Sequence, residues 1–287
     1  MSVIGGLGGH IAKDGSALNC IRTWGIAHSA ALQAAVCSAS KGATIQVPGN
    51  TDWTGQFTGY GHIPPVIPGE SFLFAGAITG VDAAAIGAGG TARVDQIVIN
   101  WDIEAGTVIN YSVGFSANGT LTIGTVTAPA DSAVPAPQTS KGCVVKIAPG
   151  AAFNSFTAIN DVRTATLTIG RANPAYVSSA TSGQSKREKG ALSASVSLSL
   201  YAQAADGWAT FPQVNVPYAI QLFTDDSLFW LLKWVTFSEL GGLDVDMETA
   251  AIVGCSPTAQ HNAVQDVSDT PTIGEITDPD SSTIWPE

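Results

Sequence analysis

The chain has 287 residues, a formal net charge of −11 and only 12% charged residues. This balance argues against a protein that grips nucleic acid, because phosphate binding needs clustered cations. No apolar run is long enough to cross a membrane, and the first 15 residues lack the basic stretch and apolar core of a signal peptide. We therefore expect a protein made in the cytoplasm and largely covered by neighbouring subunits; a secreted β protein of low charge is the alternative.

In the first half of the chain, most predicted elements are short strands. The alanine-rich stretch 29–40 is predicted as a short helix, and the proline-rich stretch 59–72 as an edge or connecting loop. Residues 92–103 predict a half-buried strand, because apolar side chains alternate there with polar ones at Val94, Ile97, Ile99 and Trp101. Residues 112–124 predict a hairpin that turns at Asn118-Gly119.

The second half continues the same pattern. Residues 191–202 alternate apolar side chains with serine, which predicts an antiparallel strand with one buried face. The segments after Ser227 and from 243 to 254 are also predicted as strands. Short strands with frequent turn signals are typical of a sandwich or barrel, so the sequence predicts an all-β protein.

An octapeptide near the N-terminus recurs about half a chain later. SALNCIRT (16–23) and TAINDVRT (157–164) share four identical residues, among them the pairs Asn19/Asn160 and Arg22/Arg163. Further matches follow in the same order: SASKGA with SKREKGA, residues 53–61 with 194–202, Pro68 with Pro217, Phe74 with Phe223 and Trp101 with Trp234. We interpret this order as an internal duplication; chance similarity among strands rich in Val, Ser and Thr is the alternative.

The repeat divides the chain into four predicted parts. Residues 1–124 form the first β half, and residues 143–257 form the second. Residues 125–142 are rich in Ala, Pro, Ser and Thr and are predicted as an extended linker. Residues 258–287 form an acidic tail, which we expect to be ordered only by docking on a neighbouring subunit.

The sequence contains no motif for catalysis or for a cofactor. GxSxG and GxxxxGK[ST] are absent, and the four histidines, at positions 10, 28, 62 and 261, are scattered. We therefore expect no cofactor, no metal site and no enzymatic activity. The cysteines, at positions 20, 37, 143 and 255, have no metal-binding spacing and are expected to be reduced, buried thiols.

Two charged clusters are candidate functional features. Asp244, Asp246 and Glu248 alternate along one predicted strand and share a face. A solvated acidic strip is the interpretation we favour; a Ca²⁺ or Mg²⁺ site is one alternative, and the lining of a channel that carries DNA is another.

The second cluster is a basic loop formed by Lys186, Arg187 and Lys189. We expect this loop to contact an acidic surface of a neighbouring subunit, with the C-terminal tail as one candidate. A solvated loop is the alternative.

Residues Val94–Leu121 follow the pattern VxxIxxxWxIxxGxxIxYxVxFxAxGxL, which ends in INYSVGFSANGTL. Together with the lysine-glycine turns and the strand of alternating serines, this pattern resembles the tail tube proteins of long-tailed bacteriophages. The resemblance implies a β-sandwich with a flanking helix in each half, and six halves in a ring whose inner sheets close into a barrel. For a duplicated chain it implies three copies in each ring.

The resemblance also implies a place and partners. Rings would stack into a tube in the virion tail, assembled in the host cytoplasm, and genomic DNA would pass through without specific binding. Other tail proteins would bind the tube ends, and the chain would not insert into a membrane.

Two other structural functions compete with this one. A capsid decoration or neck protein would also be cytoplasmic and oligomeric, but it would bind a lattice rather than form a helical stack. A carbohydrate-binding β-sandwich would expose a row of aromatic side chains, whereas Trp53, Trp101 and Trp234 lie in phase with apolar neighbours or in matched positions of the repeat, which favours the core. An enzyme would need titratable groups gathered in a cleft.

Overall fold

The computed structural model describes residues 9–41, 43–78, 85–127, 129, 137–149, 155–159, 162–200, 214–223, 229–239, 244–246, 251–253, 258–261 and 276–277. Within these residues the regular structure is almost entirely β, and the helical segments are two single 3-10 turns, Ser38–Ser40 and Ser179–Thr181. The predicted all-β class is confirmed. No helix in the described part of the chain is long and apolar enough to span a membrane.

The strands of the first half are β1 (His10–Lys13), β2 (Ser16–Ala17), β3 (Ile21–Ala35), β4 (Ile45–Tyr60), β5 (Ser71–Ala77), β6 (Ala85–Asp102) and β7 (Asn110–Val126). Those of the second half are β8 (Val145–Pro149), β9 (Thr157–Ile159), β10 (Val162–Arg171), β11 (Ala175–Tyr176), β12 (Lys186–Arg187), β13 (Leu192–Leu200), β14 (Pro217–Phe223), β15 (Phe229–Glu239), β16 (Asp244–Asp246), β17 (Ala251–Val253), β18 (Thr258–His261) and β19 (Ile276–Thr277).

The main strands of the two halves pair in the same order. In the first half the order is β2-β1-β5-β6-β7-β4-β3, and every pairing is antiparallel. In the second half it is β9-β8-β14-β15-β18-β13-β10, again antiparallel throughout. Each strand of one half therefore has a counterpart with corresponding neighbours in the other.

The registers agree as well as the order. The ladder of β3 and β4 shifts between Ile21 and Thr23, and the ladder of β10 and β13 shifts between Val162 and Thr164, 141 residues later. A second shared bulge lies between Val94 and Gln96 in β6 and between Phe237 and Glu239 in β15. Bulges interrupt a ladder at defined positions, so these two fix which residues of the halves correspond.

Two turns with left-handed backbone also correspond. Lys41 and Ser182 end the two 3-10 turns with φ of 50° each, again 141 residues apart. SASKGA therefore corresponds to SATSGQ (179–184), and its predicted match with SKREKGA is wrong. Gly69 and Asn215 both have positive φ and donate their backbone N–H to the carbonyls of Val94 and Phe237, at 2.7 and 3.0 Å.

The register also corrects three single-residue matches. Ser71 and Pro217 begin corresponding pairings, so Pro68 does not match Pro217. Along the same strands, Phe74 corresponds to Ile220 rather than to Phe223, and Trp101 falls beyond the end of β15 rather than on Trp234. Similar side chains recur in both halves, but these aromatic residues do not occupy equivalent places.

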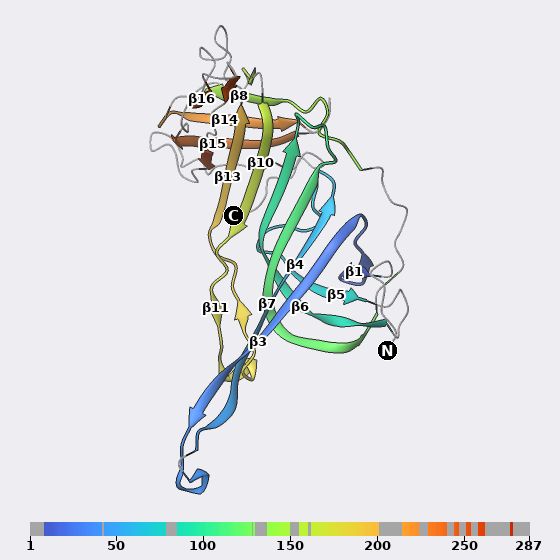
Figure 1. Cartoon of the computed structure of the whole chain (residues 1–287), viewed down its shortest axis with the longest axis vertical. Coiled ribbons are helices and arrows are strands. Elements are labelled where there is room, and N and C mark those ends of the chain that lie inside the picture. The colour runs from blue at the N-terminus through green and yellow to red at the C-terminus, as the bar shows by residue number, and fades with distance from the viewer. Residues whose placement is uncertain are drawn as a thin grey trace.

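One ladder joins the two halves into a single 15-stranded sheet. The sequence analysis predicted two separate halves and did not predict this ladder. Residues Gln96–Asp102 of β6 pair with Thr164–Gly170 of β10. The buried apolar side chains of both halves accordingly form one cluster, which includes Trp101, Phe115, Leu167, Val196 and Phe237. Figure 1 shows β8, β10 and β13–β15 of the second half above the strands of the first, β11 reaching down beside the first half, and the β3–β4 hairpin projecting away at the bottom.

The alternating strand patterns are confirmed. Val94, Ile97, Ile99 and Trp101 are all buried in β6, and Ala194, Val196, Leu198 and Leu200 are buried in β13. The segment after Ser227 forms β15, as predicted, but the single strand predicted over 243–254 is wrong, because Asp244–Asp246 and Ala251–Val253 are two strands that pair antiparallel. Residues 61–70, which contain three prolines, connect β4 to β5 without a strand.

The predicted helix over 29–40 is wrong. Residues up to Ala35 belong to β3 and pair with the first residues of β4. An isolated alanine-rich helix is only marginally stable, and no side chain of this stretch is buried that would hold a helix against the core. The ladder instead satisfies the backbone groups of both strands.

The predicted turn at Asn118-Gly119 is also wrong, because β7 continues through these residues. β6 pairs with β7 on both sides of them, through Ala92 with Ala117 and Gly90 with Leu121. The register shift between the two pairs leaves Asn118–Thr120 as a bulge. Asn-Gly therefore marks a bulge here rather than a chain reversal.

Two predicted boundaries also move. β18 pairs with β13 and β15, so the second half extends at least to His261 rather than ending at residue 257. β19 pairs with β15 of the same chain, so these two parts of the predicted tail are held by pairing within the chain, and docking of the tail on a neighbour stays a prediction. The predicted linker begins inside β7, and its buried Ser140 donates a hydrogen bond to the Thr107 carbonyl at 2.8 Å.

Candidate functional site

The contacts between the halves form the candidate functional site, because they show how one half of this chain binds another. Two of these contacts involve several hydrogen bonds each among the described residues. One lies where residues 172–191, which carry β11 and β12 and are called here the second arm, meet β4 and β7. The other is the ladder of β6 with β10. The β3–β4 hairpin, from residue 29 to residue 52, is called here the first arm.

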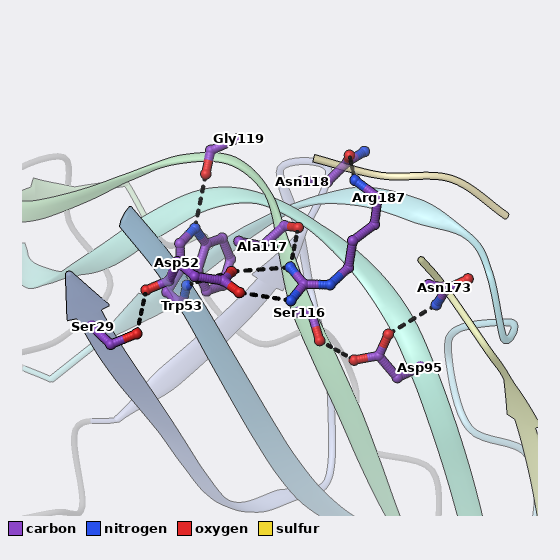
Figure 2. Close-up of polar contacts among 10 residues, drawn as sticks. All are labelled: Ser29, Asp52, Trp53, Asp95, Ser116, Ala117, Asn118, Gly119, Asn173 and Arg187. Atoms are coloured by element: carbon purple, nitrogen blue, oxygen red, sulfur yellow. Dashed lines mark hydrogen bonds and ion pairs between the residues drawn. The ribbon is translucent and has the colours of Figure 1, made fainter. Parts of the chain in front are cut away.

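Arg187 anchors the second arm to the first half (Figure 2). Its guanidinium donates to both carboxylate oxygens of Asp52, at 3.0 and 2.8 Å, and to the Ala117 carbonyl at 2.7 Å. Its backbone N–H donates to Asn118 Oδ1 at 3.0 Å. The Arg187 side chain is only 10% exposed, and a bidentate pair of this kind is stronger and more specific than a single contact.

The neighbours of Arg187 are fixed by the first half alone. Trp53 donates its backbone N–H to Asp52 Oδ1 at 2.8 Å and its indole N–H to the Gly119 carbonyl at 2.9 Å. The bulge in β7 thus presents both Asn118 and the Gly119 carbonyl at this place (Figure 2). The first half thus supplies the hydrogen-bond acceptors of this contact, and the second half supplies the arginine side chain that donates to them.

A second polar contact lies nearby in Figure 2, on Asp95 at the bulge of β6. Asn173 donates to Asp95 Oδ1 at 2.8 Å and to the Val94 carbonyl at 2.9 Å. Ser116 donates to the other oxygen of Asp95. The second arm is therefore held on both sides of its hairpin, through Asn173 before β11 and through Arg187 in β12.

The ladder of β6 with β10 ends in an ion pair. Arg163 Nε donates to Glu104 Oε2 at 2.7 Å, and the Arg163 carbonyl accepts from the backbone N–H groups of Ile103 and Glu104 at 2.9 and 3.0 Å. Arg163 is the second-half copy of the arginine in the repeated octapeptide. It therefore fastens the first half to the second.

The predicted basic loop is corrected for Arg187, whose carboxylate partner belongs to its own chain and not to a neighbour. Lys186 and Lys189 are exposed, and their contact with another subunit stays a prediction. Burial lowers the pKa of Lys189, and the positive charges of Arg171 and Arg93 lower it further.

The other predicted site residues fall in different places. Asp244 and Asp246 lie on β16, which pairs with β17, whereas Glu248 and Asn160 lie outside the described residues. Asn19 lines a hollow of about 390 Å³ together with Cys20 and Tyr111. Arg22, the first-half copy of Arg163, is exposed.

β3 carries a free edge. It pairs with β4 on one side, and no strand among the described residues pairs with its other side. Sequence reasoning missed this edge, although the repeated octapeptide contains its first residues. Unpaired edges recruit other strands, so this edge belongs to the candidate site.

Metal and thiol chemistry are not evident in the described part of the chain. It holds no group of three or more His, Cys, Asp or Glu side chains that could bind a metal ion. Cys20, Cys37 and Cys143 form no disulfide with one another, but Cys37 is exposed, so the prediction of buried thiols fails there. Comparison with family models and with curated proteins finds no match for this chain.

Proposed function

We propose that this chain is a self-assembling structural subunit of the tail tube type, located in a virion tail. Three copies would supply six similar halves to one ring, and rings would stack into a tube through which DNA passes. We further propose that the two halves arose by duplication and that the chain has no catalytic role. The resemblance of Val94–Leu121 to tail tube proteins motivates the specific assignment.

One observation carries the proposal: the halves share strand order, register and bulges, and the first half already binds the second edge to edge. A ring of similar halves needs such a contact. Within the chain it is made once, through β6 and β10, and repeating it between copies would generate a closed ring or an open filament.

The low charge supports the same proposal. A net charge of −11, with no Lys or Arg after Lys233, disfavours binding of the DNA backbone while leaving the protein soluble. A tube must let DNA slide through, so weak affinity suits it. Other tail proteins at the tube ends are the expected partners.

Electron microscopy of the purified full chain at high concentration, together with its mass in solution, tests this proposal. Rings of three copies with a sixfold outline, or hollow tubes built from them, are the expected result. A chain that stays monomeric at every concentration contradicts it.

A capsid decoration or neck protein is the second candidate, because exposed apolar side chains gather on the first arm. Leu32, Val36, Ile45 and Val47 are 44–63% exposed there. A decoration protein would use such an arm to grip a lattice. Isolated trimers that never stack, yet bind empty capsids, would favour this candidate over a tube.

A further inference from the structure

Three cationic side chains converge on Gly69, in the loop that connects β4 to β5. Arg93 of β6 donates from Nη1 to the Gly69 carbonyl at 2.8 Å. Arg171 and Lys189 pack so closely against Gly69 that a Cβ there would lie 2.4 Å from Arg171 Cδ and 3.1 Å from Lys189 Cγ. The first half therefore brings one cation to this place, and the second half brings two.

The carboxylates that flank these cations in the chain have partners of their own. The partner is Lys13 for Glu70, Asn173 for Asp95 and Tyr176 for Glu188. Among the described residues, no ion pair joins a carboxylate to Arg93 or to Lys189. The described part of the chain therefore leaves the charges of Arg93 and Lys189 without a bonded carboxylate.

The three like charges lie close enough to repel one another. Burial lowers the pKa of Lys189, and the positive charges of Arg171 and Arg93 lower it further. Arg171 is only 6% exposed, and the Nε donor of Arg93 is buried with no acceptor among the described residues. Cations gathered away from water are unfavourable unless an anion compensates their charge.

We propose that Arg93, Arg171 and Lys189 form a binding site for a small tetrahedral oxyanion of the phosphate class. A guanidinium matches the oxygens of a phosphate with N–H donors in a fixed plane, and an ammonium adds a compact positive charge. Lys189 is exposed, so the site is open to solvent on that side. The bound anion would join the first half to the second arm. This inference goes beyond the proposed function and does not depend on it.

The burial of Arg171 favours a free anion over the backbone of a nucleic acid. A small ion can reach a guanidinium that is almost fully covered, whereas a phosphate held in a duplex cannot approach as closely. The chain also carries a net charge of −11, which repels DNA as a whole. Inorganic phosphate is therefore the probe that matches the site.

Titration calorimetry of the full chain with inorganic phosphate, at constant ionic strength, tests the inference. One phosphate is expected to bind each chain and to raise the temperature of thermal unfolding, because the ligand binds only the folded state. Lys189→Met should weaken phosphate binding about tenfold or more, since it removes a charge-assisted hydrogen bond. Arg93→Gln should weaken it likewise from the first half, and Lys189→Arg should keep it.

Lys186→Met is the matched control, because it removes another exposed cation of the same loop and changes the net charge equally. It should bind phosphate like the unchanged chain. Equal weakening in Lys186→Met and Lys189→Met would overturn the site, since net charge alone would then govern binding. Thermal unfolding without phosphate verifies that each variant is folded.

Two further results overturn the inference. One is a folded, unchanged chain that binds no phosphate, which leaves the proposed function standing. The other is short duplex DNA that binds the chain and is displaced by phosphate. Nucleic acid would then be the ligand, and the weak affinity for DNA in the proposed function would be contradicted as well.

Discussion

The two halves share a backbone register but fill their cores differently. Gly55 pairs with Phe115 in the first half, and the corresponding pair in the second half is Val196 with Ala259. The Phe115 ring covers Gly55 so closely that a Cβ there would lie 2.3 Å from Cε2. In the second half, these two positions hold a branched residue and a small one. A swap of this kind moves volume from one partner to the other, which cores tolerate when the total changes little.

This difference explains why the repeat is visible in the sequence at the octapeptide and fades elsewhere. Turns and bulges constrain the backbone at single positions, such as Lys41 and Ser182, whereas a core constrains only the sum of the volumes packed across a pair. Two halves can therefore keep their strand order and several bulges in register while losing most of their side-chain identity, although the β14–β15 ladder shifts between Tyr218 and Ile220 where the β5–β6 ladder does not.

The largest effect is expected from breaking the glycine–aromatic pair. Phe115→Ala should lower the free energy of unfolding by about 3–5 kcal/mol, because Phe115 contacts Trp53, Phe57, Phe72 and Phe74. Gly55→Val alone should cost about 1–3 kcal/mol through overpacking against the ring. Urea unfolding followed by fluorescence and circular dichroism measures both changes.

The double variant sharpens the comparison, since it copies the pair of the second half. Gly55→Val with Phe115→Ala should be more stable than the sum of the single changes implies, by about 1 kcal/mol or more, because the new methyl groups occupy space that the ring leaves. Additive losses would show that the two positions are not coupled, and would contradict the volume exchange between the halves.

The arms also differ, because the second arm is bonded on both sides of its hairpin, whereas the first arm is bonded at its base, where Thr51 and Asp52 contact Gln184 and Arg187. Arg187 holds the second arm on Asp52, whereas the first arm exposes its apolar side chains. Arg187→Met is expected to free the second arm at a cost of about 1–3 kcal/mol, because it removes the guanidinium bonds to both Asp52 oxygens and to the Ala117 carbonyl. Hydrogen exchange over residues 172–191 measures the release.

Lys186→Met is the control for that experiment, because it removes a neighbouring exposed cation of the same strand. Exchange over the second arm should stay slow in this variant. Equal acceleration in both variants would indicate that the net positive charge of the loop, rather than the bidentate contact, holds the arm.

Alternation was enough to predict the strands but not their partners. Apolar residues in this segment alternate every two positions except between Val94 and Ile97, which are three apart. This irregularity marks the bulge in β6. The ladder of β6 with β10 joins residues about 70 apart, and nothing local encodes it. The contact of Arg187 with Asp52 also joins residues far apart in the sequence, so sequence reasoning predicted that Arg187 binds a carboxylate but placed that carboxylate on a neighbouring subunit.

The two wrong elements have a shared physical cause. Local preference favoured a helix at 29–40 and a turn at Asn118-Gly119, but in each case a long ladder with a distant strand satisfied more backbone groups. Tertiary pairing overrides weak local preference in this way. The candidate site depends on such pairings, so it was predictable only as a set of charged residues.

The smallest expected effect is a loss of unfolding free energy at alkaline pH, caused by a buried tyrosine that only the first half contains at this position. Tyr111 pairs with Gly59, and the missing side chain of Gly59 leaves room for the tyrosine ring. In the second half, the residue that corresponds to Gly59 is Leu200. Burial raises the pKa of Tyr111 above its ordinary value of about 10, and the neighbouring Cys20 raises it further. The folded chain thus holds this proton more tightly than the unfolded chain.

The stabilisation from Tyr111 is fully present below pH about 10 and is lost as the pH rises toward the folded pKa, because only the unfolded phenol then releases its proton. Unfolding free energy should therefore fall above pH about 10, by up to about 1.4 kcal/mol for each pH unit. Tyr111→Phe should flatten this slope, and Tyr60→Phe, at a more exposed position nearby, should not. Equal slopes in the unchanged chain and Tyr111→Phe would assign the alkaline loss to other groups.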